Sequence, residues 1–203
     1  MTDYEQSNPD QPEPTPQRQH VSARVPEHVS RGVFSTGVLV MTGPNEFVLD
    51  FIQNLGGPAQ VAARIVMPAI TVGQFIQALE TNLDLYKNRF GEPPEMPRPP
   101  QPAKKPTVQQ IYDDLKVPDE VMVGSYANGV MIGHGAAEFK FDFLANLVPQ
   151  PAVSNRVFLA APQVPRLLES LKKTHEQWQQ RVREQQERNQ QPPEEGGEES
   201  QED

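Results

Sequence analysis

The chain has 203 residues, a net charge of −9 and no cysteine. The lack of cysteine excludes a disulfide framework and a thiolate metal site, and it fits a reducing compartment. No apolar run approaches the about 18 residues that a membrane-spanning helix needs, and the polar, proline-rich start does not resemble a signal peptide. We therefore expect a cytoplasmic protein that makes no contact with a membrane.

Residues 26–89 and 118–181 are two copies of one sequence. At a constant offset of 92 positions (118 − 26), 18 of the 64 aligned residues are identical and no gap is needed. Self-similarity of this extent indicates a tandem duplication. The predicted organisation is a disordered N-terminal tail (1–23), repeat 1 (24–91), a proline-rich linker (92–106), a short helix with repeat 2 (107–186) and an acidic disordered tail (187–203).

Each repeat is predicted to begin with two strands. The β-rich segment VFSTGVLVM predicts a strand at 33–41, and its counterpart lies at 125–133. The phrase EFVLDFIQNL at 46–55 predicts a second strand and returns as EFKFDFLANL in the other copy. Alternation along this strand places its phenylalanines on an inner face and its aspartate on an outer, solvated face.

A third strand is expected to return as a hairpin partner of the second strand. In a uniform register it sets Asp50 opposite Arg64 in repeat 1 and Asp142 opposite Arg156 in repeat 2. Opposite charges that face each other across strands stabilise a sheet by a few tenths to about 1 kcal/mol. We interpret these four residues as structural cross-strand pairs.

The last element of each repeat is predicted to be a helix. Thr71 and Gln74 have the spacing of a capping box, which predicts that the first helix begins there. Apolar residues then recur at steps of three and four, so one face of the helix is expected to cover the phenylalanine side of the sheet. The predicted unit is β-β-β-α.

A unit of 64 residues is marginal as an independently folded domain, because it buries only a small hydrophobic core. The strands also carry apolar residues on the side away from the helix, and such a sheet requires a second cover. We therefore predict an α+β fold of two β-β-β-α repeats, with antiparallel sheets each covered by a C-terminal helix. The repeats are expected to pack as a pseudo-twofold intramolecular dimer, which is compatible with further homo-oligomers.

The second copy resembles the small bacterial and archaeal family called domain of unknown function 3467. That family has a Tyr-x-Asn near the start, a Glu-Phe-x-x-Asp-Phe strand, an Arg-Val strand and a leucine-rich helix. The first copy departs from it with Phe34 and Thr36 in place of the tyrosine and asparagine. The resemblance implies a compact, dimer-like domain and no known activity. The matching residues are Tyr126, Asn128, Glu138, Phe139, Asp142, Phe143, Arg156 and Leu171.

No catalytic, cofactor-binding or metal-binding residues are predicted. The four histidines are not at metal-ligand spacing, and His134 is expected in a solvated turn. The glycines form no nucleotide-binding motif. The repeated carboxylates Glu46 and Asp50 lie four residues apart on a strand, which separates them by about 13 Å and disfavours a paired acid and base.

The sequence is therefore interpreted as a non-enzymatic protein-interaction or assembly module with an unidentified protein partner. Phe34, Tyr126 and Asn128 form its candidate binding surface. Neither repeat is basic, which argues against nucleic acid as the main partner. Two alternatives stay open: a Pur-like module in which Phe34 and Tyr126 stack on single-stranded nucleic acid beside Arg31, Arg64 and Arg156, and a holdase chaperone similar to SecB.

Overall fold

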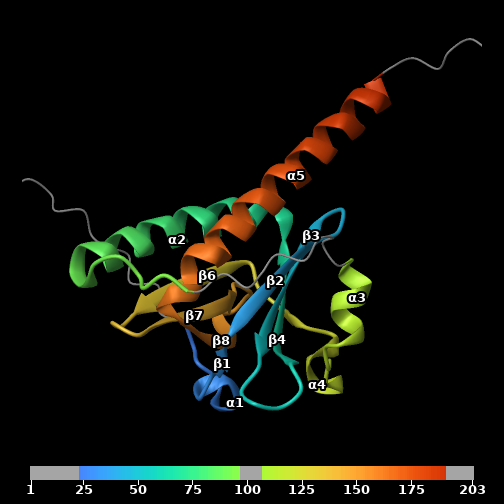
Figure 1. Ribbon diagram of the computed structural model, residues 1–203. Coiled ribbons are helices and arrows are strands. Elements are labelled where there is room, and N and C mark those ends of the chain that lie inside the picture. Colours follow the sequence, from blue (N-terminus) through green and yellow to red (C-terminus); the bar gives the residue numbers. More distant parts are fainter. Residues whose placement is uncertain (1–22, 97–106, 191–203) are drawn as a thin grey trace, which may run out of the picture.

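The computed structural model describes residues 23–96 and 107–190 (Figure 1). This part of the chain is a mixed α+β protein with two four-stranded sheets, and a long helix follows the strands of each repeat. The first repeat contains α1 (Glu27–Ser30), β1 (Val33–Ser35), β2 (Gly37–Thr42), β3 (Glu46–Gln53), β4 (Gln60–Pro68) and α2 (Ala69–Phe90). The second contains α3 (Val108–Asp113), α4 (Asp119–Met122), β5 (Ser125–Tyr126), β6 (Gly129–His134), β7 (Glu138–Ala145), β8 (Ala152–Ala160), the 3-10 helix η1 (Ala161–Gln163) and α5 (Val164–Gln190).

The prediction of one first strand in each repeat is wrong. The segment forms two strands, and these belong to different sheets. A break at Thr36 separates β1 from β2, and a break at Ala127 and Asn128 separates β5 from β6. Each repeat therefore has four strands rather than three. Hydrophobic alternation did not reveal the break, since both short strands have apolar residues on either side of it.

The two repeats exchange their first strands. β1 pairs with β8 in a sheet of order β1-β8-β7-β6, and β5 pairs with β4 in a sheet of order β2-β3-β4-β5. Both exchanged pairings are parallel, so the sheets are mixed and not antiparallel as predicted. We call residues 24–35 arm 1 and residues 116–126 arm 2. Each arm is also held at its start, where Arg24 bridges to Ala152 and Lys116 bridges to Gln60.

The inner faces of the two sheets and the two long helices share one hydrophobic core. Figure 1 shows α2 and α5 on the same side of the sheets. Phe75 of α2 lies edge-on to two rings of β7, with centroids 6.1 Å from Phe141 and 5.9 Å from Phe143. Phe51 of β3 is 5.6 Å from Phe143. Each helix thus packs against the other repeat as well as its own, which corrects the expectation of one helix for each sheet.

An aromatic residue near the middle or end of each long helix makes the same contacts with the opposite repeat. Tyr86 of α2 donates a hydrogen bond of 2.8 Å to the carbonyl of Ala136, and its ring lies 5.2 Å from Phe139. Trp178 of α5 donates one of 2.9 Å to the carbonyl of Pro44, and its ring lies 6.3 Å from Phe47. The offset of 92 relates Tyr86 to Trp178, Pro44 to Ala136 and Phe47 to Phe139, so the two sets of contacts are equivalent.

Two local predictions were also wrong in detail. The register between β3 and β4 shifts at a bulge between Phe51 and Ile52, so it is not uniform along the hairpin. The helix α2 begins at Ala69, before the predicted capping box, and Thr71 donates its hydroxyl to the carbonyl of Pro68 instead. A capping box does occur at Thr107 and Gln110, at the start of α3.

The helix α5 continues to Gln190, so residues 187–190 are helical although the sequence analysis assigned them to the acidic tail. The C-terminal part of α5 projects from the body of the protein (Figure 1). Of the predicted segments, residues 1–22 of the N-terminal tail (1–23), residues 97–106 of the linker (92–106) and residues 191–203 of the acidic tail (187–203) lie outside the described residues. Over residues 23–96 and 107–190, no helix has the length and apolar character needed to cross a membrane.

The exchange of arms predicts that neither repeat forms its native sheet alone. A fragment of residues 23–96 lacks β5, which pairs with β4, and its own β1 has lost β8. We expect fragments 23–96 and 107–190 to show weak, broad thermal transitions separately and to form a 1:1 complex with native circular dichroism when mixed. A monomeric 23–96 fragment that melts cooperatively at the temperature of the full chain would contradict this.

Candidate functional site

The structure brings the two predicted Asp and Arg residues of each repeat together. Asp50 lies opposite Arg64 in the register of β3 and β4, and Asp142 lies opposite Arg156 in β7 and β8. The guanidinium of Arg64 donates from Nε to Oδ1 at 2.8 Å and from Nη2 to Oδ2 at 2.7 Å. In the other repeat the same two bonds are 2.6 Å and 3.0 Å long. Such two-pronged pairs are stronger and more directional than single ion pairs.

The aspartates of these pairs do not lie on a solvated face, as was predicted, but are buried, and their arginines are partly buried. The residue Asp50 is 0% exposed and Asp142 is 3% exposed. The arms of the opposite repeat provide the cover, because α4 packs on β4 and α1 packs on β8. Since a buried carboxylate is costly unless it is paired, the arginines are needed wherever the arms close over the outer face.

Each arginine also binds the arm that covers it. Arg64 donates from Nη1 to the carbonyl of Met122 in arm 2, and Arg156 donates in the same way to the carbonyl of Ser30 in arm 1, both at 3.0 Å. Hydrogen bonding to Asp50 raises the pKa of Arg64 above its ordinary value, against the opposing effect of burial. Each arginine thus links its own hairpin to the opposite repeat.

A glycine in each arm allows this close approach. Gly32 and Gly124 have φ angles of +65° and +81°, which favour glycine. A Cβ atom on Gly32 would lie 2.7 Å from Cγ of Arg156, and one on Gly124 would lie 2.9 Å from Cγ of Arg64. The aliphatic part of each arginine therefore packs directly on the backbone of the arm.

Among the described residues, a tyrosine contacts the Asp–Arg pair of the first repeat and none contacts that of the second. The hydroxyl of Tyr112 in α3 donates to Oδ2 of Asp50, and Arg64 lies 5.9 Å above its ring. Burial, followed by the hydrogen bond to Asp50, raises the pKa of Tyr112 to about 12. In the second repeat Lys140 approaches Asp142 instead, at 3.3 Å.

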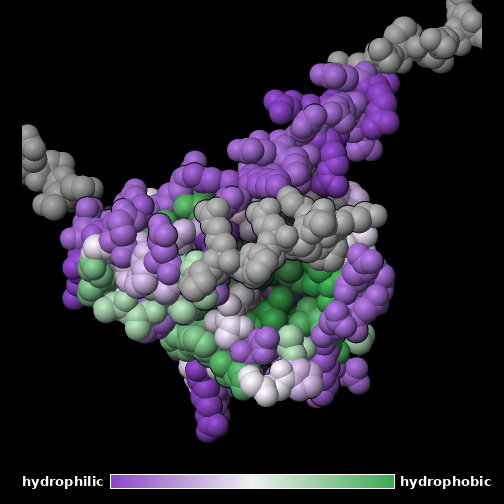
Figure 2. Space-filling model, in the orientation of Figure 1, coloured by the Kyte–Doolittle hydropathy of each residue, from purple (hydrophilic) through white to green (hydrophobic). Residues whose placement is uncertain are grey.

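In Figure 2 hydrophobic surface gathers over the strands beside α3.

Phe34 and Tyr126 occupy equivalent places on the two arms. Phe34 in β1 is 42% exposed and pairs with Phe158, and Tyr126 in β5 is 44% exposed and pairs with Val66. Both strands are sheet edges, so the two rings belong to different sheets. They are exposed as a binding surface would require, but they do not form one continuous aromatic platform along a single sheet.

Asn128, the third residue of the candidate surface, holds a turn together. Its Oδ1 accepts a hydrogen bond of 2.8 Å from the backbone N–H of Asn146. In the first repeat the hydroxyl of Thr36 accepts the equivalent bond, 3.1 Å long, from the N–H of Asn54. The departure from the family pattern at Thr36 therefore keeps the same local contact, and the amide of Asn128 is used inside the molecule.

His134 lies in β6 and not in a solvated turn. Its ring lies 5.9 Å from Tyr86, 6.3 Å from Phe90 and 5.2 Å from Phe139. Its Nδ1 atom is buried and has no hydrogen-bond partner among the described residues. Burial, followed by the charge of Arg89, lowers the pKa of His134 below its ordinary value.

The sequence analysis missed the open edges of the sheets. β2 and β6 each end a sheet and each have six residues, whereas the other two edges, β1 and β5, have three and two. Neither GVLVMT nor GVMIGH contains Asp, Glu, Lys, Arg or Pro. Proteins ordinarily protect sheet edges with such residues. That compositional signal was present in the sequence, but it means little until an edge position is known.

Comparison with known proteins places the chain in a family. The model of a family described as "Protein of unknown function (DUF3467)" matches it twice, over residues 1–93 and 96–184. The chain belongs to this family. The double match confirms the tandem duplication, and the first DUF3467 match includes residues 1–23, which were predicted to be a tail. No curated protein and no solved structure matches the chain.

The described part of the two DUF3467 repeats contains no group of three or more His, Asp and Glu side chains placed to hold a metal ion. In the Asp–Arg clusters both carboxylate oxygens are bound by guanidinium N–H groups. The remaining guanidinium N–H groups bind the arm carbonyls, so the clusters hold the arms against the sheets.

The buried ion pairs predict a large loss of stability when one partner is removed from a DUF3467 repeat. Arg64→Leu leaves the Asp50 carboxylate buried without its cation, with the hydroxyl of Tyr112 as its remaining partner, and removing one partner of a buried ion pair typically costs about 3–5 kcal/mol. Urea unfolding monitored by circular dichroism measures the change. Lys172→Met, which removes the exposed ion pair with Glu80, is the control and should cost at most about 1 kcal/mol. Equal losses in the two variants would contradict the assignment.

The environment of His134 predicts loss of stability in acid. Its folded pKa lies below the ordinary value of 6.5, so the folded state binds this proton less readily than the unfolded state. The contribution of neutral His134 to the free energy of unfolding is present above pH 6.5 and is lost as pH falls through the folded pKa. We expect His134→Thr, which copies the residue at the corresponding position 42, to reduce the fall in unfolding free energy between about pH 7 and pH 5. An unchanged fall would contradict this.

Proposed function

We propose that this protein is a non-enzymatic interaction module that binds extended segments of other proteins at the open edges of its sheets. The two repeats act as one body, arranged as a pseudo-twofold internal dimer. The exchanged arms and the matching contacts of Tyr86 and Trp178 support that arrangement. The cysteine-free sequence is compatible with such a role in the cytoplasm.

The observation that carries the proposal is the pair of long, uncharged edge strands, β2 and β6. An edge strand presents backbone N–H and C=O groups without partners, and an extended peptide can satisfy them by adding a strand to the sheet. The equivalent edges β1 and β5 are much shorter and serve the exchange between repeats. Two edges in one chain allow one partner to bind at two points or two partners to bind together.

The alternative in which nucleic acid binds requires free basic groups near Phe34 and Tyr126. The guanidinium groups of Arg64 and Arg156 are instead occupied by Asp50 and Asp142. Strand addition depends on backbone groups and needs no basic surface. We therefore favour a protein partner.

Hydrogen exchange tests strand addition. Peptides selected from a random displayed library by binding to the full chain should slow amide exchange at alternate residues of β2 or β6. The amides of the intervening residues, which already bond to β3 or β7, are the internal control and should change little. Selected peptides that protect neither edge, or a library that yields no binder, would contradict the proposal.

A further inference from the structure

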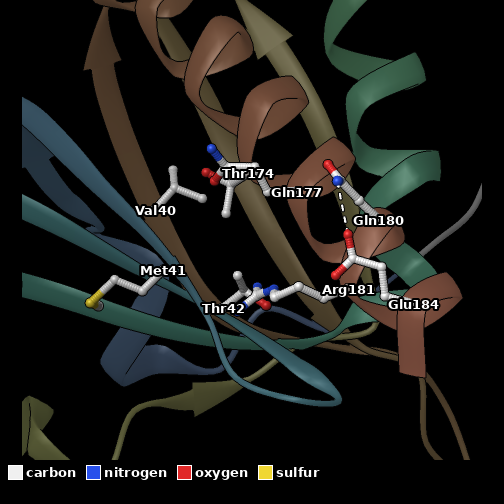
Figure 3. Close-up of a pocket in the computed structure, with 8 residues that line it drawn as sticks. All are labelled: Val40, Met41, Thr42, Thr174, Gln177, Gln180, Arg181 and Glu184. Atoms are coloured by element: carbon white, nitrogen blue, oxygen red, sulfur yellow. Dashed lines mark hydrogen bonds between the residues drawn. The ribbon is translucent and has the colours of Figure 1, made fainter. Parts of the chain in front are cut away.

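A groove separates the outer edge of β2 from the helix α5. Its volume is about 750 Å³, and Val40, Met41 and Thr42 form its strand side. Figure 3 shows Arg181 reaching from α5 toward Thr42, while the side chain of Met41 points away from the helix. The helix side is formed by Thr174, Gln177, Gln180, Arg181 and Glu184.

The groove is open because small residues stand where the other repeat has rings. Thr42 and Val182 correspond to His134 and Phe90 at the offset of 92. In the other repeat these two rings lie 6.3 Å apart and both contact Tyr86, so they fill the space between β6 and α2. The difference distinguishes the two edges. The groove at β2 runs along the end of the strand to Arg181, whereas the cavity at β6 lies at the start of that strand, beside Gly129, Val130 and Met131.

The backbone of β2 is oriented to accept a further strand. The N–H of Gly43 bonds to the carbonyl of Glu46 at 2.9 Å, which fixes the hydrogen-bonded pairs between β2 and β3. Because these pairs alternate in an antiparallel ladder, the N–H and C=O groups of Val38, Val40 and Thr42 point to the open side. An added strand would therefore bond to residues that line the groove.

The sides of the groove define the chemistry of that strand. Alternate side chains of an added strand would face α5, where the lining is polar and includes Arg181. The guanidinium of Arg181 forms no hydrogen bond or ion pair within the described residues, whereas Glu184 accepts a hydrogen bond of 2.9 Å from Gln180. The other side chains would lie on the outer face beside Met41, whose sulfur lies 3.4 Å from the hydroxyl of Tyr112.

We infer that the groove between β2 and α5 binds an extended acidic segment of a partner protein. The segment adds to β2 as an outer strand, places a carboxylate side chain at Arg181 and turns alternate apolar side chains to the outer face. The helix α5 covers one side of the β2 edge. Because this leaves room for a single extended chain, the partner segment has no folded structure of its own at this point. This inference rests on the proposed function and specifies its edge and its ligand.

A charge swap tests the inference in the full chain. The probes are two short synthetic peptides in which valine alternates with threonine, with either glutamate or lysine at one central threonine position. Fluorescence anisotropy should show the glutamate peptide binding about twofold to fivefold more tightly than the lysine peptide, as expected for one exposed ion pair. Arg181→Glu should reverse that preference.

The repeat supplies matched controls. Arg89 corresponds to Arg181 but lies over the ring of Phe90, so Arg89→Glu should leave the preference unchanged. Val40→Pro removes an outward N–H from the edge of β2 and should weaken the glutamate peptide at least about tenfold, as proline is tolerated at edge positions. Ile132→Pro, the same change in β6, should leave the affinity for the glutamate peptide unchanged. Circular dichroism verifies that each variant is folded.

The outcomes separate the two proposals. Binding that protects β6 amides, or that is unaffected by Arg181→Glu, overturns the acidic groove and leaves strand addition standing. Failure of every extended peptide at both edges overturns the proposed function as well. A concentration-dependent dimer that Val40→Pro abolishes would show that a second copy occupies the edge, which also overturns the inference.

Discussion

Each sheet of this protein is completed by a strand from the other repeat. β4 and β8 would otherwise be sheet edges, and the arms bring both backbone partners and cover for a buried carboxylate. The constraint is electrostatic as well as geometric. Asp50 and Asp142 tolerate burial because Arg64 and Arg156 neutralise them, and the same arginines bind the arm carbonyls. The ion pair, the covering arm and the strand exchange therefore depend on one another.

The exchange also decides which edges remain available. Because β1 and β5 protect β8 and β4, the long edges left at the ends of the sheets are β2 and β6. The helices α5 and α2 approach these edges from the inner face, so any ligand there meets backbone on one side and a helix on the other. The proposed strand addition uses backbone groups that this architecture places at the two edges.

Differences between the repeats indicate where the two halves have diverged. Thr36 and Asn128 make the same turn contact with different side chains, which preserves structure. Tyr112 and Lys140 provide different partners for the equivalent aspartates. Thr42 and His134 differ in size, and this alters the space between strand and helix. The first difference keeps the local structure, whereas the last changes where the space between the edge strand and the helix lies open.

The duplication, the phenylalanine face, the long helices and the facing of Asp50 with Arg64 could be predicted from the sequence, because they depend on local periodicity and hairpin register. The other features depend on contacts between distant parts of the chain. The break at Thr36 leads one apolar run into two sheets, and alternation is the same on both sides of it. Burial of Asp50 depends on the arm that contains Met122, 72 residues (122 − 50) further along the chain, and long-range pairing of this kind leaves no periodic trace in sequence. The open edges and the groove depend in turn on that pairing, so only the assembled fold revealed them.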